Sequence, residues 1–221
     1  LNPSFAIKDL SASASKILRE RELCEIKKKK EYLFEFENIS GEQLYLNAMV
    51  NYPELVGMKA NLYICFLPLA WMLGTNNGIS AFIHPEGVFN DPGGEKLRVS
   101  TYPKLKKHFR FSNAFKLFPD VHTSREFGLN IYCNNESSSF EQIVNLYTAK
   151  TIDQCYESDR VLPVYMRTKE GKRNTQGCRS RILVIGKNQL IIFANIVEGN
   201  NHWKSTRLMN LYVNSLMGVL E

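Results

Sequence analysis

One segment, residues 60–78, limits the possible folds more than any other part of this sequence. Residues 60–73, ANLYICFLPLAWML, are apolar almost all round, and Leu62, Phe66 and Ala70 follow helical spacing. This predicts a buried helix with an irregularity at Pro68. The turn sequence GTNNG follows, and then ISAFIH, which predicts a short buried strand. A helix, a tight turn and an apolar strand together indicate an α/β unit.

Polar residues follow this strand directly, in His84-Pro85-Glu86-Gly87. In open α/β sheets the ligand crevice lies outside the carboxyl ends of the strands. Position alone therefore makes His84 and Glu86 candidates for a site, with capping of the next turn and helix as the alternative.

The segments HFRFSNAFKLF and EFGLNIYC read as two strands joined by the short polar loop PDVHTSR, which predicts an antiparallel hairpin. We therefore expect an α/β sheet that ends in an antiparallel hairpin. On the amino-terminal side, residues 13–36 predict one charged helix and residues 42–52 a short second helix. Residues 163–181 are polar and basic, with two glycines, and predict an exposed loop or hairpin.

The net charge of +6 favours a polyanionic partner, although ordinary solvated surfaces can be equally basic. The cations fall into three clusters, which suits contact with a nucleic-acid backbone better than scattered lysines would. The clusters are Lys27–Lys30; Lys104, Lys106, Lys107, His108 and Arg110; and Arg167, Lys169, Lys172, Arg173, Arg179 and Arg181.

Several classes of protein are not expected. The sequence has no apolar run of membrane-spanning length and no signal-peptide pattern, so we expect a cytoplasmic protein. Its five cysteines lack zinc spacing and predict reduced thiols, and no metal site is expected. There is no P-loop, no GxG, no GxSxG and no HExxH. One hypothesis places Asp120, His122 and Glu126 in a metal or acid/base site. We favour the alternative that they are polar loop residues that cap the hairpin.

The central run resembles a known family. It reads NLYICFLPLAWMLGTNNGISAFIHPEGVFNDPGGEKLRVSTYPKLKKHFRFSNAFKLFPDVHTSREFGLNIY. This order is similar to the catalytic-domain portion, downstream of the target-base loop, of large adenine-N6 DNA methyltransferases of bacterial restriction-modification and phage-defence systems. Gly93 stands where the family often has Lys.

The resemblance implies a partial Rossmann-like methyltransferase sheet, with S-adenosylmethionine as the cofactor of the intact enzyme and double-stranded DNA as the partner. Such an enzyme flips an adenine out of the duplex and methylates N6, because a stacked base cannot meet the methyl group. On this basis we divide the chain into a helical flanking segment at 1–58, the carboxyl-terminal half of the methyltransferase core at 59–135, and a mixed helical and basic-loop extension at 136–221.

Two parts of the family pattern are missing from this sequence: the Gly-rich cofactor loop and the Asn-Pro-Pro-aromatic loop. We therefore expect no tight binding of S-adenosylmethionine and no methylation by this chain alone, and we expect an upstream catalytic half or other subunits as partners. The sequence lacks an initiator Met, which suggests that it begins inside a longer protein. The alternative is a non-catalytic nucleic-acid-binding or specificity partner of a restriction-modification or defence system.

The opening Asn2-Pro3-Ser4-Phe5 differs by one residue from Asn-Pro-Pro-Phe. Either Asn2, Pro3 and Phe5 form a degenerate catalytic loop, or the stretch is a look-alike that lies just past the real loop. Serine frees the backbone angle that proline fixes, and we favour the look-alike.

The resemblance and the charge pattern give two sets of candidate residues. The candidates for the substrate or DNA pocket are His84, Glu86, Asp91, Phe118 and His122. The candidates for contact with the DNA backbone are Lys96, Arg98, Lys106, Lys107, Arg110, Arg125, Lys172 and Arg173. For the pocket candidates, the alternatives are turn residues and, for Phe118, a core position. For the cationic candidates, the alternative is a solvated basic face.

Overall fold

The computed structural model describes residues 2–59, 61–159 and 165–220, so residues 163 and 164 of the expected basic loop lie outside the described residues. The chain divides into two compact units, Leu1–Asn51 and Tyr52–Glu221. The finer division at 58/59 and 135/136 stays a prediction.

The first unit is helical and consists of α1 (Ser4–Ile7), α2 (Ala12–Glu22) and α3 (Ile26–Asn47). The expected single helix over 13–36 is wrong, because Glu25 takes an extended backbone and separates α2 from α3. The expected second helix at 42–52 is also wrong as a separate element. Gly41 lies inside α3, which continues to Asn47, since one interior glycine costs only about 1 kcal/mol. No residue of α2 or α3 is buried.

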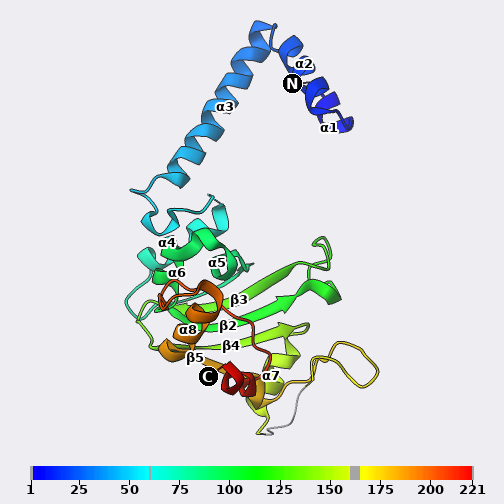
Figure 1. The fold of residues 1–221 in the computed structure, drawn as a ribbon. Coiled ribbons are helices and arrows are strands. Elements are labelled where there is room, and N and C mark those ends of the chain that lie inside the picture. The colour runs from blue at the N-terminus through cyan, green and yellow to red at the C-terminus, as the bar shows by residue number, and fades with distance from the viewer. Residues whose placement is uncertain (1, 60, 160–164, 221) are drawn as a thin grey trace. The chain divides into compact units, whose positions relative to one another are not determined.

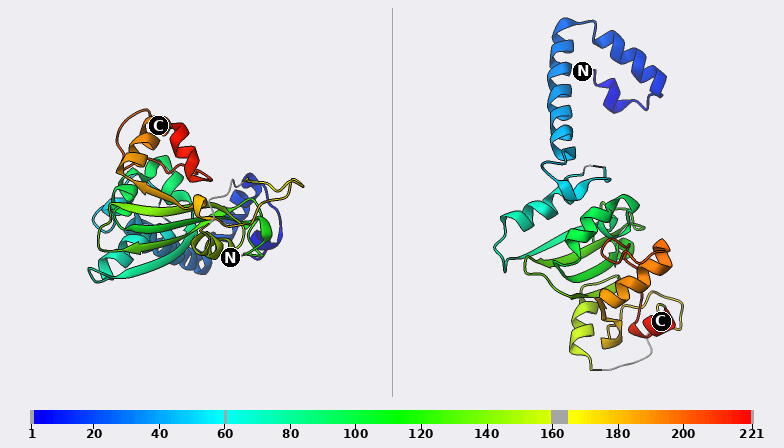
Figure 2. Two further views of the ribbon diagram at one scale, coloured as in Figure 1. Left: turned by 90° about the horizontal axis from the view of Figure 1, so that it is seen from below. Right: turned by 60° about the vertical axis from the view of Figure 1, so that its left-hand side comes forward.

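The second unit contains a five-stranded mixed sheet in the order β1-β3-β2-β4-β5 (Figure 1 and Figure 2). The strands are β1 (Ile79–Pro85), β2 (Leu105–Ser112), β3 (Glu126–Cys133), β4 (Ser139–Leu146) and β5 (Leu183–Gly186). β3 is antiparallel to both β1 and β2, and β4 is parallel to β2 and antiparallel to β5. The expected α/β fold with an antiparallel hairpin is confirmed.

This pairing gives β1, β2 and β4 the same direction, so their carboxyl ends lie at one edge of the sheet. We call this the carboxyl edge, formed by the segments that follow His84, Ser112 and Leu146. It is the edge at which α/β sheets commonly bind ligands.

Helices cover the two faces of the sheet. Trp71 of α4 contacts Tyr132, Phe89 of α5 contacts His108, and Tyr102 beside α6 stacks on Phe140. On the other face, α7 packs against β2 and β4 through Cys155 and Tyr156.

Within the described part of the chain, no helix is long and apolar enough to cross a membrane. The helices of this unit are η1 (Pro53–Leu55), α4 (Leu62–Leu73), α5 (Gly87–Asn90), η2 (Pro92–Gly94), α6 (Glu95–Thr101), η3 (Asn113–Phe115), α7 (Lys150–Glu157), η4 (Arg179–Arg181), α8 (Lys187–Phe193), the π-helical η5 (Ala194–Glu198), η6 (Asn214–Leu216) and α9 (Met217–Leu220).

The helix expected at 60–73 and the strand expected at 79–84 are present as α4 and β1, but the expectation that both are buried is wrong. α4 buries one side, including Ile64 and Trp71, and leaves Phe66 52% exposed. β1 is an outer strand of the sheet, with only one neighbouring strand, and leaves Ile83 58% exposed. Hydropathy of these segments reports how apolar they are, whereas the position in the sheet decides which sides are covered.

The face of the sheet under α7 carries a compact apolar cluster. Shortening a side chain of this cluster should destabilise the fold more than shortening an exposed side chain. Ile143 of β4 has no exposed surface and packs among Phe109, Phe111 and Leu146. We expect Ile143→Ala to lower the free energy of unfolding by about 2–5 kcal/mol, because it leaves a cavity. Urea unfolding followed by tryptophan fluorescence measures this change.

Ile83→Ala removes the same atoms from exposed β1 and is the matched control. We expect it to change the free energy of unfolding by no more than about 0.5 kcal/mol. Equal losses in the two variants would contradict the assignment of β1 as an uncovered edge.

Candidate functional site

His84 lies at the carboxyl end of β1 and is almost completely buried. Its Nδ1 lies 2.8 Å from the Pro85 carbonyl oxygen, which can only accept, so Nδ1 carries the proton. Nε2 then accepts from the Tyr132 hydroxyl and the Asn130 amide, both at 3.0 Å. Burial lowers the pKa of His84, although the Pro85 carbonyl and the Glu86 carboxylate favour the charged ring. The imidazole is therefore held neutral.

Glu86 follows on the same turn and points into the sheet. Its carboxylate oxygens lie 3.3 and 3.1 Å from His108 Nε2, and Arg110 Nε lies 3.8 Å from one of them. Burial opposes ionisation of Glu86, but the contacts with His108 and the charge of Arg110 outweigh it, and the pKa of Glu86 lies below its ordinary value. A buried charge of this kind is stable only because it is paired.

His108, on β2, is fully buried and connects Glu86 to the next strand. Gln142 Nε2 donates to the Met209 carbonyl and also lies 3.2 Å from His108 Nδ1, which therefore accepts. Room for this arrangement comes from Gly128 of β3. A Cβ there would stand 2.5 Å from Glu86 Oε1 and 2.6 Å from Asn130 Nδ2.

These side chains form two buried polar groups, one around His84 and one around Glu86, which span β1, β3, β2 and β4 and which together we call the Glu86 network. It comprises His84, Glu86, His108, Arg110, Asn130, Tyr132 and Gln142. Arg110 also forms an ion pair with Glu126. The hydrogen-bonding atoms of His84 and Glu86 face protein groups rather than solvent, so these two side chains present no free nucleophile or base. The side-chain oxygens of Asn130 and Gln142 are buried without a hydrogen-bond partner. Among the described residues, no group of three His, Cys, Asp or Glu side chains could hold a metal ion.

The loop between β2 and β3 contributes the second part of the carboxyl edge. Buried Asn113 organises the loop by donating to the Phe118 and Val121 carbonyls and accepting from the Phe118 amide. Lys116 adopts a left-handed backbone, with φ 54°. Phe118 is 39% exposed and meets Phe127 edge to face at 4.9 Å, so it is neither a fully buried core residue nor a free one.

The remaining pocket candidates do not converge on the Glu86 network. Asp91 Oδ1 accepts from Gly93 N at 2.8 Å and so holds a turn. Exposed His122 contacts the Ser124 hydroxyl within the loop between β2 and β3. Of the predicted pocket residues, the structure therefore brings together only His84 and Glu86.

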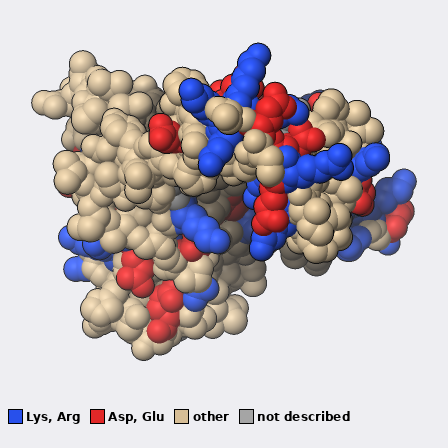
Figure 3. Space-filling model, turned by 90° about the horizontal axis from the view of Figure 1, so that it is seen from above, with Lys and Arg blue, Asp and Glu red and all other residues tan. Residues whose placement is uncertain are grey.

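The cationic candidates separate into groups. Lys96, Arg125, Lys172 and Arg173 are exposed. Lys106 and Lys107 lie towards the amino end of β2, away from the carboxyl edge, and Lys107 pairs with Glu141 at 2.7 Å. Figure 3 shows lysines and arginines interspersed with acidic side chains on one face, rather than one uninterrupted basic patch.

Arg98 requires a correction. It is only 1% exposed, and its guanidinium donates to the Ser205 carbonyl at 2.7 Å and the Asp91 carbonyl at 2.6 Å. These bonds join α6 to distant segments of the second unit, so Arg98 cannot meet a phosphate and leaves the set of DNA-backbone candidates.

The stretch Asn2-Pro3-Ser4-Phe5 opens the short helix α1. Asn2 Oδ1 accepts from the Ser4 amide, and Asn2 Nδ2 donates to Glu22, both at 2.9 Å. The amide group that a catalytic loop would offer to its substrate is thus engaged within the first unit.

Sequence reasoning missed several members of the network. His108 was noticed only as part of a basic run, and Asn130 and Gln142 were not singled out. A signal was present, because Asn130 lies between Leu129 and Ile131 of a strand, at a position whose side chain faces the same side as the buried Tyr132. Polar residues at inward-facing strand positions indicate buried hydrogen-bond networks.

No protein-family model and no curated protein matches this sequence. The chain is similar to several solved structures, two of which belong to type I restriction enzymes. The first is described as the modification subunit of a type I restriction enzyme from Vibrio vulnificus YJ016, with TM-score 0.44, 13% identity and coverage of 76% of this chain. The second is the type I restriction enzyme EcoKI M protein, with TM-score 0.41, 12% identity and 75% coverage. The chain spans 36% and 43% of their lengths. The likeness is too distant to assign an activity.

The Glu86 network predicts that Gly128 tolerates no side chain. We expect Gly128→Ala to lower the melting temperature by several degrees, because the new Cβ would push against the Glu86 carboxylate and the Asn130 amide. Differential scanning calorimetry measures the shift. Gly218→Ala is the control, since nothing lies within 4 Å of a Cβ there. A Gly128→Ala protein as stable as the control would refute the close packing.

The neutral state of His84 predicts a pH-dependent stability. The unfolded chain protonates its histidines below about 6.5, whereas the folded protein resists protonation of His84, so acidification through that value favours unfolding. Glu86 adds a further loss at lower pH, as its carboxylate is protonated. We expect the melting temperature to fall between pH 7.5 and 5.5, and to fall less in His84→Gln. Parallel pH profiles of the two proteins would exclude His84 as the cause.

Proposed function

We propose that this chain is part of an adenine-specific DNA methyltransferase of a bacterial restriction-modification or phage-defence system, active in the cytoplasm. One observation carries the proposal. The segment HPEG bonds to both other segments that resemble the family, because His84 is hydrogen-bonded to Asn130 and Tyr132 of NIY, and Glu86 is hydrogen-bonded to His108 of HFRF. Motifs that are distant in sequence thus serve a single arrangement, which supports common descent of the whole run over chance similarity of its pieces.

The residues at the carboxyl end of β1 do not fit an adenosyl cofactor. His84 and Glu86 direct their polar atoms inward and are satisfied there, so neither can receive a ribose hydroxyl or an amino group. The sequence contains no GxG for a cofactor loop. S-adenosylmethionine is therefore assigned to the intact enzyme, in which an upstream catalytic half or another subunit supplies the groups that bind it.

The role of this chain is then to contact the DNA substrate rather than the cofactor. The carboxyl edge carries the exposed cation Arg125 and the half-exposed ring of Phe118, and the loop with the exposed cations Lys172 and Arg173 contacts this edge at Tyr147. These groups suit contact with phosphates and bases of double-stranded DNA. A non-catalytic DNA-binding or specificity partner is the alternative function, and the poor fit to the cofactor favours it over an enzyme that acts alone.

A pair of measurements tests the proposal. We expect calorimetric titration of S-adenosylmethionine into the isolated chain to show no binding at micromolar concentrations. Addition of a polypeptide from the same locus that carries the Gly-rich and Asn-Pro-Pro-aromatic loops should restore transfer of tritiated methyl groups to adenine in DNA.

The Asn2→Ala variant adds a control for the location of catalysis. Because Asn2 is engaged by Ser4 and Glu22, we expect the reconstituted enzyme to keep its activity when Asn2 is replaced. Tight cofactor binding by the isolated chain, or an inactive Asn2→Ala enzyme, would overturn the division of labour. DNA binding without any restored methylation would favour the non-catalytic partner.

A further inference from the structure

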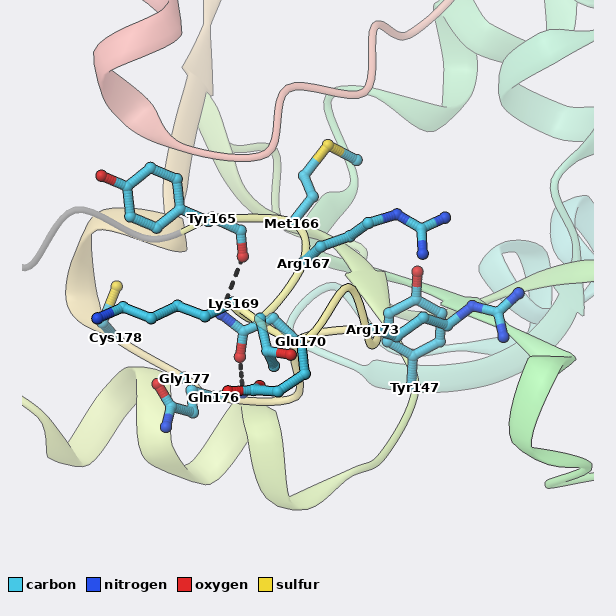
Figure 4. Close-up of a pocket in the computed structure, with 12 residues that line it drawn as sticks. Tyr147, Tyr165, Met166, Arg167, Lys169, Glu170, Arg173, Gln176, Gly177 and Cys178 are labelled. Carbon is cyan, nitrogen blue, oxygen red and sulfur yellow. Dashed lines mark hydrogen bonds between the residues drawn. The ribbon is translucent and has the colours of Figure 1, made fainter.

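A pocket lies beyond the end of β4, between Tyr147 and the loop that contains residues 165–178 (Figure 4). Its volume is about 1160 Å³, which exceeds that of most small-molecule sites and leaves room for more than one nucleotide-sized group. Figure 4 shows the side chains of Arg167 and Arg173 extending on the side of the pocket where Tyr147 lies. The sequence had indicated this loop only as a polar and basic segment.

The charge of the pocket favours an anion. Arg167, Lys169 and Arg173 line it, against a single acidic residue, Glu170. The loop is a defined hairpin, because Thr168 N donates to the Lys172 carbonyl and Asn174 N to the Met166 carbonyl. Three cations on one ordered hairpin form a local concentration of positive charge that a phosphate backbone can neutralise.

Tyr147 forms the other wall of the pocket, and Phe115, which does not line the pocket, lies beside it. The ring of Tyr147 lies 5.4 Å from that of Phe115, with 32° between the ring planes. The Arg173 guanidinium lies over the Tyr147 ring at 5.5 Å from its centroid. Phe115 is 48% exposed. Ring faces and guanidinium planes of this kind take the faces of nucleobases, and such stacking does not depend on the base.

The backbone that presents Tyr147 is unusual and firmly held. Asn145 adopts a left-handed conformation, with φ 55°, and the register between β2 and β4 shifts at this point. Arg181 is fully buried and donates to the carbonyls of Val144 and Asn145 on the strand and of Gln176 on the loop. The Arg181 guanidinium therefore ties both walls of the pocket together. Non-glycine residues in this conformation concentrate at functional sites.

We propose that this pocket binds an unpaired stretch of nucleic acid, with bases stacked at the Tyr147 wall and on the adjacent exposed Phe115 ring, and with phosphates held by Arg167, Lys169 and Arg173. A paired base offers a protein only its edges in the grooves, whereas planar groups are available here: the Arg173 guanidinium over the Tyr147 ring, and the Phe115 ring beside it. The inference rests on the proposed function for the choice of nucleic acid as the partner, but it needs neither the cofactor nor methyl transfer.

The test is fluorescence anisotropy with the full chain. The probes are fluorescein-labelled dT20 and an unrelated 20-base-pair duplex, each over 50–300 mM salt. We expect dT20 to bind more tightly than the duplex. Tyr147→Ala should weaken dT20 binding by about 5- to 150-fold, the range for loss of one stacked base. Tyr147→Phe should retain binding, because the ring face remains.

Matched variants separate stacking from charge. Arg173→Gln should weaken binding and reduce the salt slope by about 0.7, the value for one phosphate contact on a single strand. Phe66→Ala removes an exposed ring from α4, and Lys104→Gln removes a cation beside the amino end of β2. We expect less than a twofold effect from either. The melting temperature of each variant shows whether it has folded.

Several results would overturn the inference. These are absence of dT20 binding by the unaltered chain at 50 mM salt, binding unaffected by both Tyr147→Ala and Arg173→Gln, and complete displacement of dT20 by an equal charge concentration of polyglutamate, which would indicate a general anion surface. Failure of the methylation assay leaves the inference standing if Tyr147-dependent binding is found. Restored methylation without such binding refutes the inference alone.

Discussion

The Glu86 carboxylate is buried where β1 ends, and the arrangement of the sheet depends on its pairing with His108. Burial of an unpaired Glu86 carboxylate would cost several kcal/mol of folding free energy. The register of β2 must therefore place His108 and Arg110 next to this carboxylate. The carboxylate also needs space on the strand between them, which only Gly128 leaves. The insertion of β3 between β1 and β2 is thereby specified by polar groups as well as by apolar packing.

The strand pairing gives β1, β2 and β4 a common direction, and so determines which segments reach the carboxyl edge. Two residues near this edge have a left-handed backbone: Lys116, which follows η3, and Asn145, the second-last residue of β4. The aromatic residues next to them in the chain, Phe115 and Tyr147, are in ring contact. The buried network therefore acts as scaffold, while the exposed rings and cations of the edge remain free to contact a partner.

Much of the fold could be predicted from sequence. The apolar helix at 62–73, the strand that ends in His84 and the hairpin were found because periodicity and turn residues are local signals. The break at Glu25 and the exposed side of α4 could not be predicted, because they depend on backbone geometry and on which faces the sheet covers. Of the candidate site, His84 and Glu86 were identified from their position, whereas Arg98 was misassigned, because its charge says nothing about the three carbonyls that surround it.

The sequence by itself determined the α/β class, the elements of the central run and the basic character of the 165–178 loop, since each follows from neighbouring residues. Only the tertiary structure decided which polar residues are partners and which are free. His84 and Asn130 are 46 positions apart in the chain, and Arg181 and Val144 are 37 apart. Hydrogen bonds over such separations exist only after the strands have paired, because strand order and register bring these side chains to within 3 Å of their partners.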